Sequence, residues 1–362
     1  MRVLLQHPHA PGEISGVVTY CERLAAALRR QGVEVMVFST HGVSGRALWR
    51  AVEQVDVVHV NSHHLWLVLF ARLRGKRVVL KYHYPYWDSV LQGPFVARGF
   101  GGRCAEELRF LVRLTSGQGA GGIKHVVVRF ARVVMRVALA FAVHRRLACS
   151  EFIARSCELP LDVAVDYYPM DLLSEVAPCP RVEPARPRFV FAGRLERRKG
   201  GEVLLRAIAH LRKSAADFEL VIIGDGPERE RLEQIVESEN LRDMVIFHGK
   251  LERAAVLAAM AQATAVVVPS RDNDALPFVV IEAAALSRCV VGSSSGGIPE
   301  LLGPDGLLFA PDDHEGLAGH LRTLLQRLSE TEARGRALHR RVSTLCDPAV
   351  AARRALEFYT AS

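Results

Sequence analysis

Two carboxylates and the start of a helix lie close together in the segment from Ala265 to Ala285. Asp274 lies on a loop that follows an apolar, buried strand, and Glu282 lies on the helix that a proline opens after this loop. The backbone N–H groups of residues 276–279 point out of the helix start, where they can bind an anion. The segment therefore predicts a site for a ligand with both hydroxyl groups and phosphates. A plain alternative is that Asp274 caps the helix and Glu282 is solvated.

A second group of charges lies in the stretch FAGRLERRKGGE, directly after another apolar strand. Arg194 can donate two parallel hydrogen bonds to a phosphate, and Lys199 adds a point charge just before a helix begins. Two cations at one strand end predict a diphosphate site. Arg197 and Arg198 of the same loop fit an ordinary solvated basic loop instead.

Two loops in the N-terminal half carry weaker signals. Gly12 and Gly16 precede a helix, where glycine lets backbone N–H groups approach a phosphate, although a plain turn has the same pattern. His83 follows a strand within KYHYPYWD, among aromatic side chains. A histidine in this position is either hydrogen-bonded within the structure or faces a sugar, and the residues alone leave both interpretations open.

These residues need parallel sheets to position them. Short apolar runs alternate with helical stretches, which predicts an α/β protein with two doubly wound, Rossmann-like domains and with ligands beyond the carboxyl ends of the strands. We expect an N-terminal domain over 1–175, a proline-rich linker over 176–188 and a second domain over 189–345. A helix over 346–362 has no clear place in either sheet, and a return to the N-terminal domain is one option.

The individual elements follow from the periodicity of apolar residues. Strands are expected at 3–5, 34–38, 57–60, 78–80, 147–150, 188–192, 220–223, 245–248, 265–268, 290–292 and 307–309. Helices are expected at 17–31, 46–54, 65–73, 123–147, 200–214, 228–238, 254–261, 278–285, 315–328 and 347–359.

Composition narrows the class of protein. The chain has 362 residues and 49% hydrophobic composition, enough for two cores, and no apolar stretch approaches the roughly 20 residues that a membrane-spanning helix needs. The seven cysteines are scattered without a CxxC spacing, so we expect a reducing cytoplasm and no metal site. The N-terminus reads as a first buried strand rather than a signal peptide.

The positive charge is concentrated in one segment. A basic helical insert over about 92–147 contains ten of the 47 basic residues and only two of the 39 acidic ones, so the rest of the chain is neutral. This distribution argues against a nucleic-acid partner. On the helix predicted at 123–147, five basic residues form one stripe: His125, Arg129, Arg132, Arg136 and His144. The stripe predicts peripheral contact with an anionic membrane surface or a lipid-linked acceptor. The alternatives are a core helix with a solvated face and a helix whose arginines bind an anionic acceptor.

Eight motifs, in this order, carry a resemblance to a known family. They are ISGVVTYCERLAAALRRQGVEV, DVVHVNSH, VVLKYHY, FAGRLERRKG, LVIIGDGPER, FHGKL, PSRDNDALPFVVIEA and SSGGIPELL. The chain resembles the GT4 family of retaining glycosyltransferases over most of its length. The resemblance implies the GT-B fold, in which two Rossmann-like domains face a central cleft and the C-terminal one binds a nucleotide-sugar, UDP- or GDP-sugar being expected here.

The resemblance also implies roles for single residues. Arg194 and Lys199 match the pair that holds the diphosphate, and Glu282 matches the carboxylate that binds the ribose hydroxyls. Asp274 stands where the family usually has glutamate in contact with the transferred sugar, which is a departure. His83 matches the histidine near the reacting centre, so the implied catalytic residues are His83, Asp274, Arg194 and Lys199. The remaining donor contacts fall on Gly16, Leu251, Leu276, Pro277 and Phe278.

The implied reaction is metal-independent, needs no cofactor besides the donor, and transfers a sugar to a glycan, a lipid-linked molecule or a small molecule. Two alternatives share the fold. A nucleotide-sugar epimerase or a phosphorylase would turn over donor without an acceptor or with inorganic phosphate. A non-catalytic nucleotide-sugar-binding protein would result if Asp274 disables the site.

Overall fold

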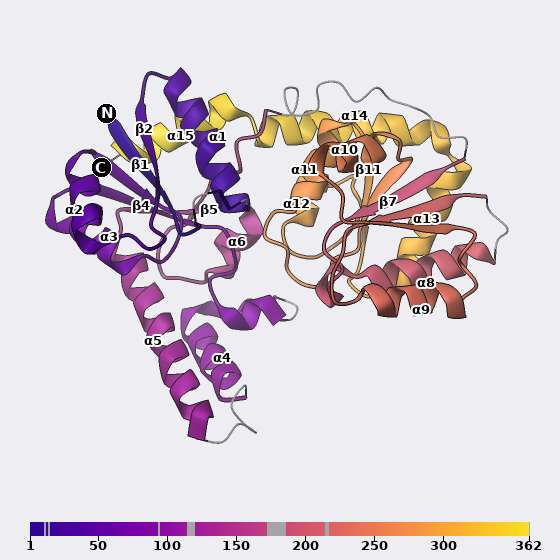
Figure 1. Ribbon diagram of the computed structural model, residues 1–362, viewed down its shortest axis with the longest axis horizontal. Coiled ribbons are helices and arrows are strands. Elements are labelled where there is room, and N and C mark those ends of the chain that lie inside the picture. The colour runs from indigo at the N-terminus through magenta and orange to yellow at the C-terminus, as the bar shows by residue number, and fades with distance from the viewer. Residues whose placement is uncertain are drawn as a thin grey trace. The chain divides into compact units, whose positions relative to one another are not determined.

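The computed structural model describes residues 1–10, 12–13, 15–92, 95–113, 120–171, 186–213 and 217–361. They form two compact units: unit 1, residues 1–170 with 346–362, and unit 2, residues 171–345 (Figure 1). Most of the predicted linker, residues 176–185, lies outside the described residues.

Unit 1 is built on a parallel sheet. Its strands are β1 (Arg2–His7), β2 (Glu34–Ser39), β3 (Val57–Val60), β4 (Arg77–Tyr82), β5 (Arg145–Ala148) and β6 (Ala164–Val165). The helices are α1 (Gly16–Arg30), α2 (Gly45–Glu53), α3 (Leu65–Leu73), η1 (Asp88–Gln92), α4 (Gly99–Arg113), α5 (Ala120–Ala142), α6 (Glu151–Ser156) and α15 (Pro348–Thr360). The strand order is β2-β1-β3-β4-β5-β6.

The sequence places β5 too late and misses β6. Strand β5 begins at Arg145 rather than Leu147, because the arginine pair that opens it does not look like a strand. Arg146 lies on the strand, and its guanidinium donates to the carbonyls of Ala140, 2.9 Å, and Asp162, 3.0 Å. Strand β6 has only 2 residues, too few for an alternating pattern.

Unit 2 repeats this architecture. Its strands are β7 (Arg188–Ala192), β8 (Glu219–Ile223), β9 (Val245–Gly249), β10 (Ala265–Val268), β11 (Cys289–Ser293) and β12 (Leu307–Phe309), in the order β12-β11-β10-β7-β8-β9. Its helices are η2 (Arg197–Lys199), α8 (Gly201–Arg212), α9 (Arg229–Ser238), α10 (Arg253–Ala261), α11 (Phe278–Ala285), α12 (Ile298–Leu302), α13 (His314–Gln326) and α14 (Leu328–Leu345). The expectation of two doubly wound parallel sheets is confirmed.

Strand order fixes where each sheet can bind a ligand. In unit 1 the chain moves from β1 outward to β2, and then from β3 in the opposite direction, so the switch point lies between β1 and β3. In unit 2 the corresponding point lies between β7 and β10. Ligands of open α/β sheets bind beyond the carboxyl ends of the strands at such points, which selects the loops after β1, β3, β7 and β10.

Helix α15 completes unit 1. It packs on α1, and the Tyr359 hydroxyl lies 2.7 Å from Nδ1 of the buried His59 on β3. The Arg77 guanidinium donates to the Phe358 carbonyl at 3.0 Å. The C-terminal helix therefore has a definite place against the N-terminal sheet, which its amphipathic pattern alone did not reveal.

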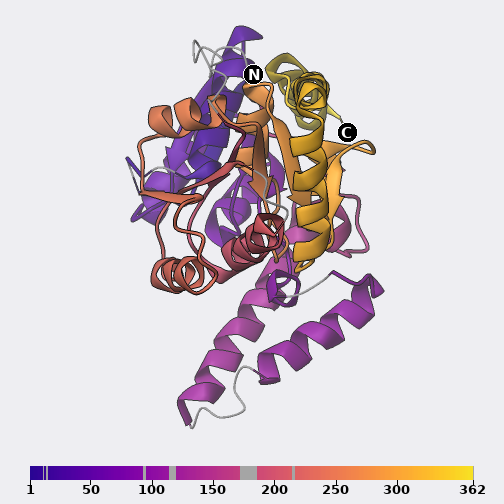
Figure 2. The same cartoon turned by 90° about the vertical axis from the view of Figure 1, so that its right-hand side faces the viewer.

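Helices α4 and α5 lie side by side in both views of the ribbon and extend away from the sheet of unit 1 (Figures 1 and 2). The predicted basic stripe on α5 is partly wrong. The helix ends at Ala142, so His144 is not on it, and the Arg136 guanidinium donates to the Tyr86 carbonyl, 3.1 Å, and to Asp88 Oδ1, 2.9 Å. An acidic residue outside the helix thus neutralises part of the stripe, which helical periodicity cannot show.

Buried histidines are expected to make the stability of unit 1 depend on pH. Burial lowers the pKa of His59 to about 3 and that of His63 to about 4, from 6.5. Between pH 4 and 6.5 the unfolded chain therefore binds more protons than the folded chain. The free energy of unfolding should fall as pH drops through this window, by up to about 1.4 kcal/mol per pH unit for each histidine.

Thermal unfolding at pH 7.5, 6 and 5 measures this effect. The variant His59→Gln, which cannot titrate there, should show a shallower decline of Tm than the unaltered chain. A Tm that does not change over the whole window would contradict the prediction.

Candidate active site

The loops after β7 and β10 meet at the switch point of unit 2. Gly200, at the end of η2, has φ of 74°, and a Cβ atom there would lie 1.8 Å from the Pro269 carbonyl oxygen. Only glycine allows this close approach of the two backbones. The Arg271 N–H donates to the Arg198 carbonyl at 2.8 Å, which ties the loops together a second time.

Lys199 and Asp274 form the centre of this arrangement. Lys199 Nζ lies 2.8 Å from each oxygen of the Asp274 carboxylate, and Ser270 Oγ donates to the same carboxylate at 2.6 Å. The side chains of Lys199 and Asp274 are 24% and 13% exposed, so both are partly shielded from water and still accessible. Asp274 is thus bonded by a lysine and a serine, and the alternative that it caps α11 is wrong.

The carboxylate of Glu196 organises two arginines of the loop after β7. Glu196 lies 2.9 Å from Arg194 Nε and 2.6 Å from Arg198 Nε. Hydrogen bonding by Arg198 holds the pKa of Glu196 below its usual value. Arg198 Nη1 also lies 3.6 Å from Asp274, so Arg198 belongs to the ionic cluster rather than to a solvated loop. The side chain of Arg194 is 73% exposed and remains within reach of a ligand.

Glu282 lies on α11 and faces a different neighbour. Its Oε1 atom is 3.2 Å from Arg253 Nε, at the start of α10, so it is not a merely solvated glutamate. Helix α11 begins at Phe278 after the buried residues Leu276 and Pro277, and Pro277 as N-cap makes no side-chain capping bond. The second carboxylate therefore lies beside the segment between β9 and α10.

Leu251 belongs to that same segment between β9 and α10. It is partly buried, and it stands two residues before Arg253, the partner of Glu282. The predicted donor contacts Leu251 and Glu282 are thus brought together by α10 and α11, whereas Lys199 and Asp274 are brought together by the loops after β7 and β10.

The loop after β11 holds the Asp274 loop in place. Ser295 Oγ donates to the Asp272 carbonyl at 2.8 Å, and the Gly297 N–H donates to the Asp274 carbonyl at 2.7 Å. Gly296 between them has φ of 57°, and a Cβ atom there would lie 2.1 Å from the Asp274 carbonyl oxygen. The motif SSGG therefore supports the carboxylate through backbone contact.

Gly296→Ala is expected to displace the Asp274 loop and to weaken nucleotide-sugar binding at least tenfold, because a positive φ and a backbone clash both oppose alanine. Titration with UDP- and GDP-sugars by calorimetry measures the loss. Gly319→Ala on α13, where nothing lies within 4 Å of the added methyl, is the matched control and should bind normally. Equal binding by both variants would contradict this role of Gly296.

In unit 1 the predicted residues Gly16 and His83 lie at the carboxyl edge of the sheet. Gly16 is the first residue of α1, and Ser15 caps the helix by accepting from the Val18 N–H at 3.2 Å. Residues 11 and 14 of the glycine loop lie outside the described residues.

His83 is 4% exposed, and both ring nitrogens have partners. Nε2 lies 2.8 Å from Asn61 Oδ1, and Nδ1 lies 2.9 Å from the Tyr168 hydroxyl. Since the Asn61 amide nitrogen donates to the Gln6 carbonyl, Asn61 Oδ1 accepts and His83 Nε2 carries the proton. Burial also sets the pKa of His83 well below 6.5, so the ring is neutral. The geometry agrees with the hydrogen-bonded interpretation, and a catalytic role stays a prediction.

Sequence reasoning missed three residues that shape the site. Ser270 and Glu196 bind charged site residues, and Arg253 neutralises Glu282. Ser270 carried a usable signal, since it is the second residue after β10, in PSRDND. Glu196 and Arg253 did not, because a charged residue in a loop or at a helix start is ordinary.

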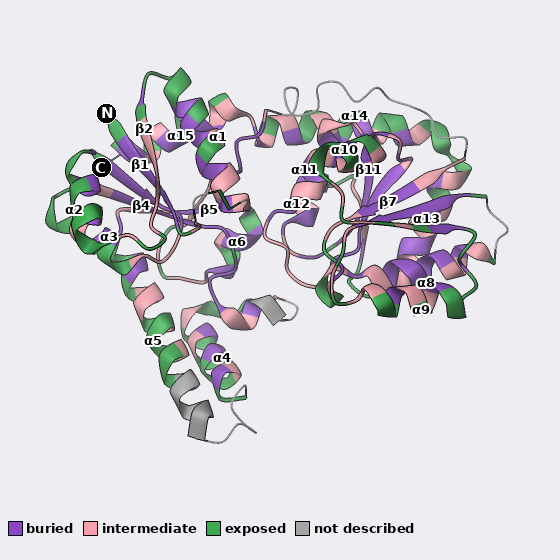
Figure 3. Ribbon diagram, viewed as in Figure 1, coloured by how far each residue is buried: buried purple, intermediate pink, exposed green. Residues whose placement is uncertain are grey.

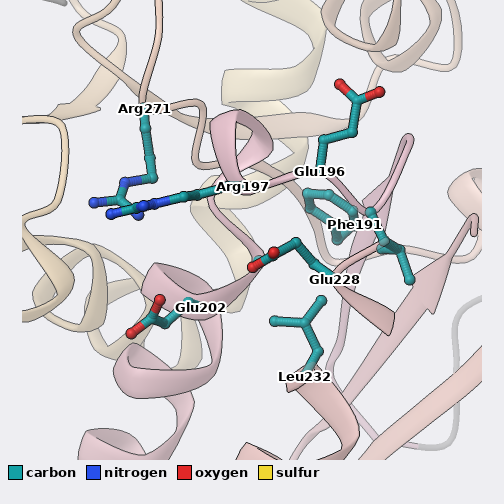
Figure 4. A pocket seen from close by; sticks show the side chains of 9 residues that line it. Phe191, Glu196, Arg197, Glu202, Glu228, Leu232 and Arg271 are labelled. Atoms are coloured by element: carbon teal, nitrogen blue, oxygen red, sulfur yellow. The ribbon is translucent and has the colours of Figure 1, made fainter. Parts of the chain in front are cut away.

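A small pocket beside η2 is too small to hold the donor. It has a volume of about 10 Å³, the space of about one water molecule. In Figure 4 the side chains of Arg197 and Arg271 extend toward the same side of it, and Glu196, Glu202 and Glu228 surround it. The pocket adds charged groups beside the site without enclosing a ligand.

The arrangement in unit 2 can bind an anion and orient a polyol. Exposed Arg194 and half-shielded Lys199 supply positive charge at the loop after β7, and the start of α11 supplies oriented N–H groups. The carboxylates of Asp274 and Glu282, at two separate positions, can accept hydrogen bonds from hydroxyl groups. Within the described part of the chain, no cluster of His, Cys, Asp or Glu suits a metal ion.

Comparison with known proteins agrees with this geometry. Residues 186–327 match the family described as Glycosyl transferases group 1. A glycogen synthase of Mycobacterium tuberculosis is 30% identical over 185 residues, which are 51% of this chain and 44% of that protein. A GDP-mannose-dependent phosphatidylinositol monomannoside mannosyltransferase of Mycolicibacterium smegmatis is 34% identical over 121 residues, 32% of each chain. The chain thus spans less than half the length of these relatives.

Solved structures resemble the whole chain. The Anabaena protein HepE in complex with UDP and glucose has a TM-score of 0.68 and 17% identity, with 100% of both chains covered. A sucrose-phosphate synthase from Thermosynechococcus elongatus has a TM-score of 0.68 and 20% identity, with 99% of this chain and 98% of that chain covered. The chain therefore has the GT-B fold, and its residues 186–327 match the family described as Glycosyl transferases group 1, which agrees with the resemblance of its motifs to the GT4 family.

Proposed function

We propose that this protein is a retaining glycosyltransferase that moves a sugar from a nucleotide-sugar to an acceptor without a metal ion. The observation that carries the proposal is the Lys199–Asp274 pair at the switch point of unit 2, 2.8 Å apart. The exposed Arg194 is linked to this pair through Glu196 and Arg198. Cations that can hold a diphosphate therefore belong to the same ionic cluster as a carboxylate that can bind sugar hydroxyls. The family match over residues 186–327 supports the same assignment.

The proposed chemistry depends on charge. Arg194 and Lys199 hold the two phosphates and stabilise the negative charge that develops as the bond between sugar and phosphate breaks. Asp274 accepts hydrogen bonds from hydroxyl groups of the transferred sugar and keeps Lys199 in position. Glu282 accepts hydrogen bonds from the ribose, and the backbone around Leu251 contacts the base.

The donor is a UDP- or GDP-sugar in this proposal. A thermal-shift panel of UDP-, GDP-, ADP- and dTDP-sugars tests it, because a ligand that binds only the folded chain raises the Tm. One nucleotide series should stabilise the protein at micromolar concentration. No stabilisation by any of the four would overturn the proposal.

Turnover assays separate the proposal from its alternatives. A transferase consumes donor faster when an acceptor is added, an epimerase converts the donor alone, and a phosphorylase requires inorganic phosphate. Binding without any turnover would identify a non-catalytic nucleotide-sugar-binding protein. Incubation of the stabilising donor with each addition in turn, followed by chromatography of the nucleotide products, distinguishes these outcomes.

The acceptor in this proposal is a glycan, a lipid-linked molecule or a small molecule.

We also propose that the protein is cytoplasmic and that its region 123–147 contacts an anionic membrane. Helix α5 has four Lys or Arg residues and no Asp or Glu, which supports this contact. None of the helices in the described residues is long and apolar enough to cross a membrane. The protein should therefore co-sediment with anionic vesicles at low salt, less so at 0.5 M salt, and failure at low salt would refute the contact.

A further inference from the structure

An apolar groove separates helices α4 and α5 of unit 1. It has a volume of about 340 Å³, within the range of small-molecule sites. Its walls include Leu108 and Leu111 of α4 and Phe130, Val133, Val134 and Val137 of α5. Among the lining residues, Glu107 carries a charge, and it is buried. Its carboxylate accepts hydrogen bonds from the backbone N–H groups of Asp88, at 3.1 Å, and Ser89, at 2.9 Å.

The rim of the groove exposes apolar side chains to water. Leu108 is 48% exposed and Val134 is 52% exposed, and the two residues belong to opposite walls. Figure 3 shows exposed segments along the described parts of both helices. Covering this surface would be favourable by about 25 cal/mol per Å² of apolar area, so the groove is suited to an apolar occupant.

The lining of the groove favours a hydrocarbon chain over a peptide. An extended peptide would bring backbone N–H and C=O groups that need partners, and these walls offer it almost none. A hydrocarbon chain needs no hydrogen bonds.

The charge of α5 indicates what such a chain is attached to. Its sequence contains Lys124, Arg129, Arg132 and Arg136 and no acidic residue, and of these Arg136 is paired with Asp88. Arg132 is exposed, and Arg109 is exposed on the other helix of the groove. We propose that the groove between α4 and α5 holds the hydrocarbon chain of an anionic, lipid-linked acceptor. This assignment of the acceptor class rests on the proposed function.

Binding of dodecyl phosphate below its micellar concentration tests the site directly, with the full chain and isothermal calorimetry. The unaltered protein should bind it, and inorganic phosphate alone should bind at least tenfold more weakly. Val134→Glu places a charge in the groove and should weaken binding at least tenfold. Val128→Glu is the matched control, because Val128 is 51% exposed on the same helix and does not line the groove.

Other outcomes overturn the proposal. Equal loss of binding in both variants would indicate adsorption to the helix surface. Equal binding of inorganic phosphate would indicate an anion site only. A dimer that Val134→Glu dissociates would indicate that a second copy of the chain occupies the groove.

Leu108→Asn on α4 should weaken binding as Val134→Glu does, so the result does not depend on the folding of one variant. The same proteins are tested for stabilisation by UDP- and GDP-sugars, so that loss of the donor site is recognised separately.

Discussion

Lys199→Ala is expected to lower kcat for sugar transfer by about 10²–10³-fold, the size of effect that follows loss of one preorganised donor to a developing negative charge. Lys199 is the half-shielded cation of the site, and its Nζ atom already lies 2.8 Å from Asp274. Its loss also removes the group that fixes the Asp274 carboxylate. The measurement is steady-state transfer with the donor that the thermal-shift panel identifies.

Arg197→Ala is the matched control for Lys199→Ala. Arg197 stands two residues earlier in η2, is exposed, and lines the small pocket of Figure 4. Its removal takes away the same charge and should change kcat less than threefold. Since Asp274 retains Ser270 as a partner, the Lys199 variant should keep its fold. Normal kcat in Lys199→Ala would remove the lysine from the proposed chemistry.

Glu282→Ala is expected to raise KM for the donor by about 10- to 100-fold, because hydrogen bonds to a charged acceptor contribute roughly 1.5–3 kcal/mol. The value of kcat should change less than KM, since ribose contacts are similar before and during the reaction. Alanine has the highest helix propensity, and Glu282 lies inside α11, so the substitution should not unfold the helix.

Arg253→Ala separates two explanations for the Glu282 effect. Arg253 is the partner of Glu282 at 3.2 Å, and its loss leaves the carboxylate in place. If Glu282 binds the ribose, Arg253→Ala should change KM far less than Glu282→Ala does. Equal effects of the two substitutions would mean that the ion pair only fixes α10 against α11, and the ribose assignment would be wrong.

The fold could be predicted because parallel strands are buried on both faces. Strand β10, AVVV, is fully buried and reads as an unbroken apolar run. Strand β3, VVHV, is also fully buried, and His59 is its one polar residue. Helix α14 was missed for the opposite reason. Its buried positions include Thr331 and Gly335, so its apolar stripe is too weak to stand out among charged neighbours.

The residues of the candidate site could be proposed from the sequence, but their pairings could not. Asp274, Lys199 and Glu282 stood out because charges beside strand ends and helix starts are informative. Their partners depend on loop conformations that Gly200 and Gly296 allow, and on contacts between segments far apart in sequence, such as Lys199 with Asp274. Local patterns do not report such distances.

Asp274 is the departure from the family pattern, and its surroundings give that departure a physical meaning. Aspartate is one methylene shorter than glutamate, and here its carboxylate is engaged at 2.8 Å by Lys199 and at 2.6 Å by Ser270. Because we propose that this carboxylate contacts the transferred sugar, glutamate would reach farther toward that sugar and aspartate would leave it more room. Donor choice is therefore the property to compare between this chain and an Asp274→Glu variant.

The position of α15 has a consequence for how the molecule is made. Unit 2 occupies a single stretch of chain, residues 171–345, whereas unit 1 needs both the first 170 residues and the segment from Cys346 onward. The Met170 N–H donates to the Cys346 carbonyl at 2.8 Å, so the chain leaves unit 1 and re-enters it at one place. During synthesis from the N-terminus, all residues of unit 2 are therefore made before unit 1 is complete. The Nδ1 atom of His59 has no Tyr359 hydroxyl to bond with until the last helix has left the ribosome.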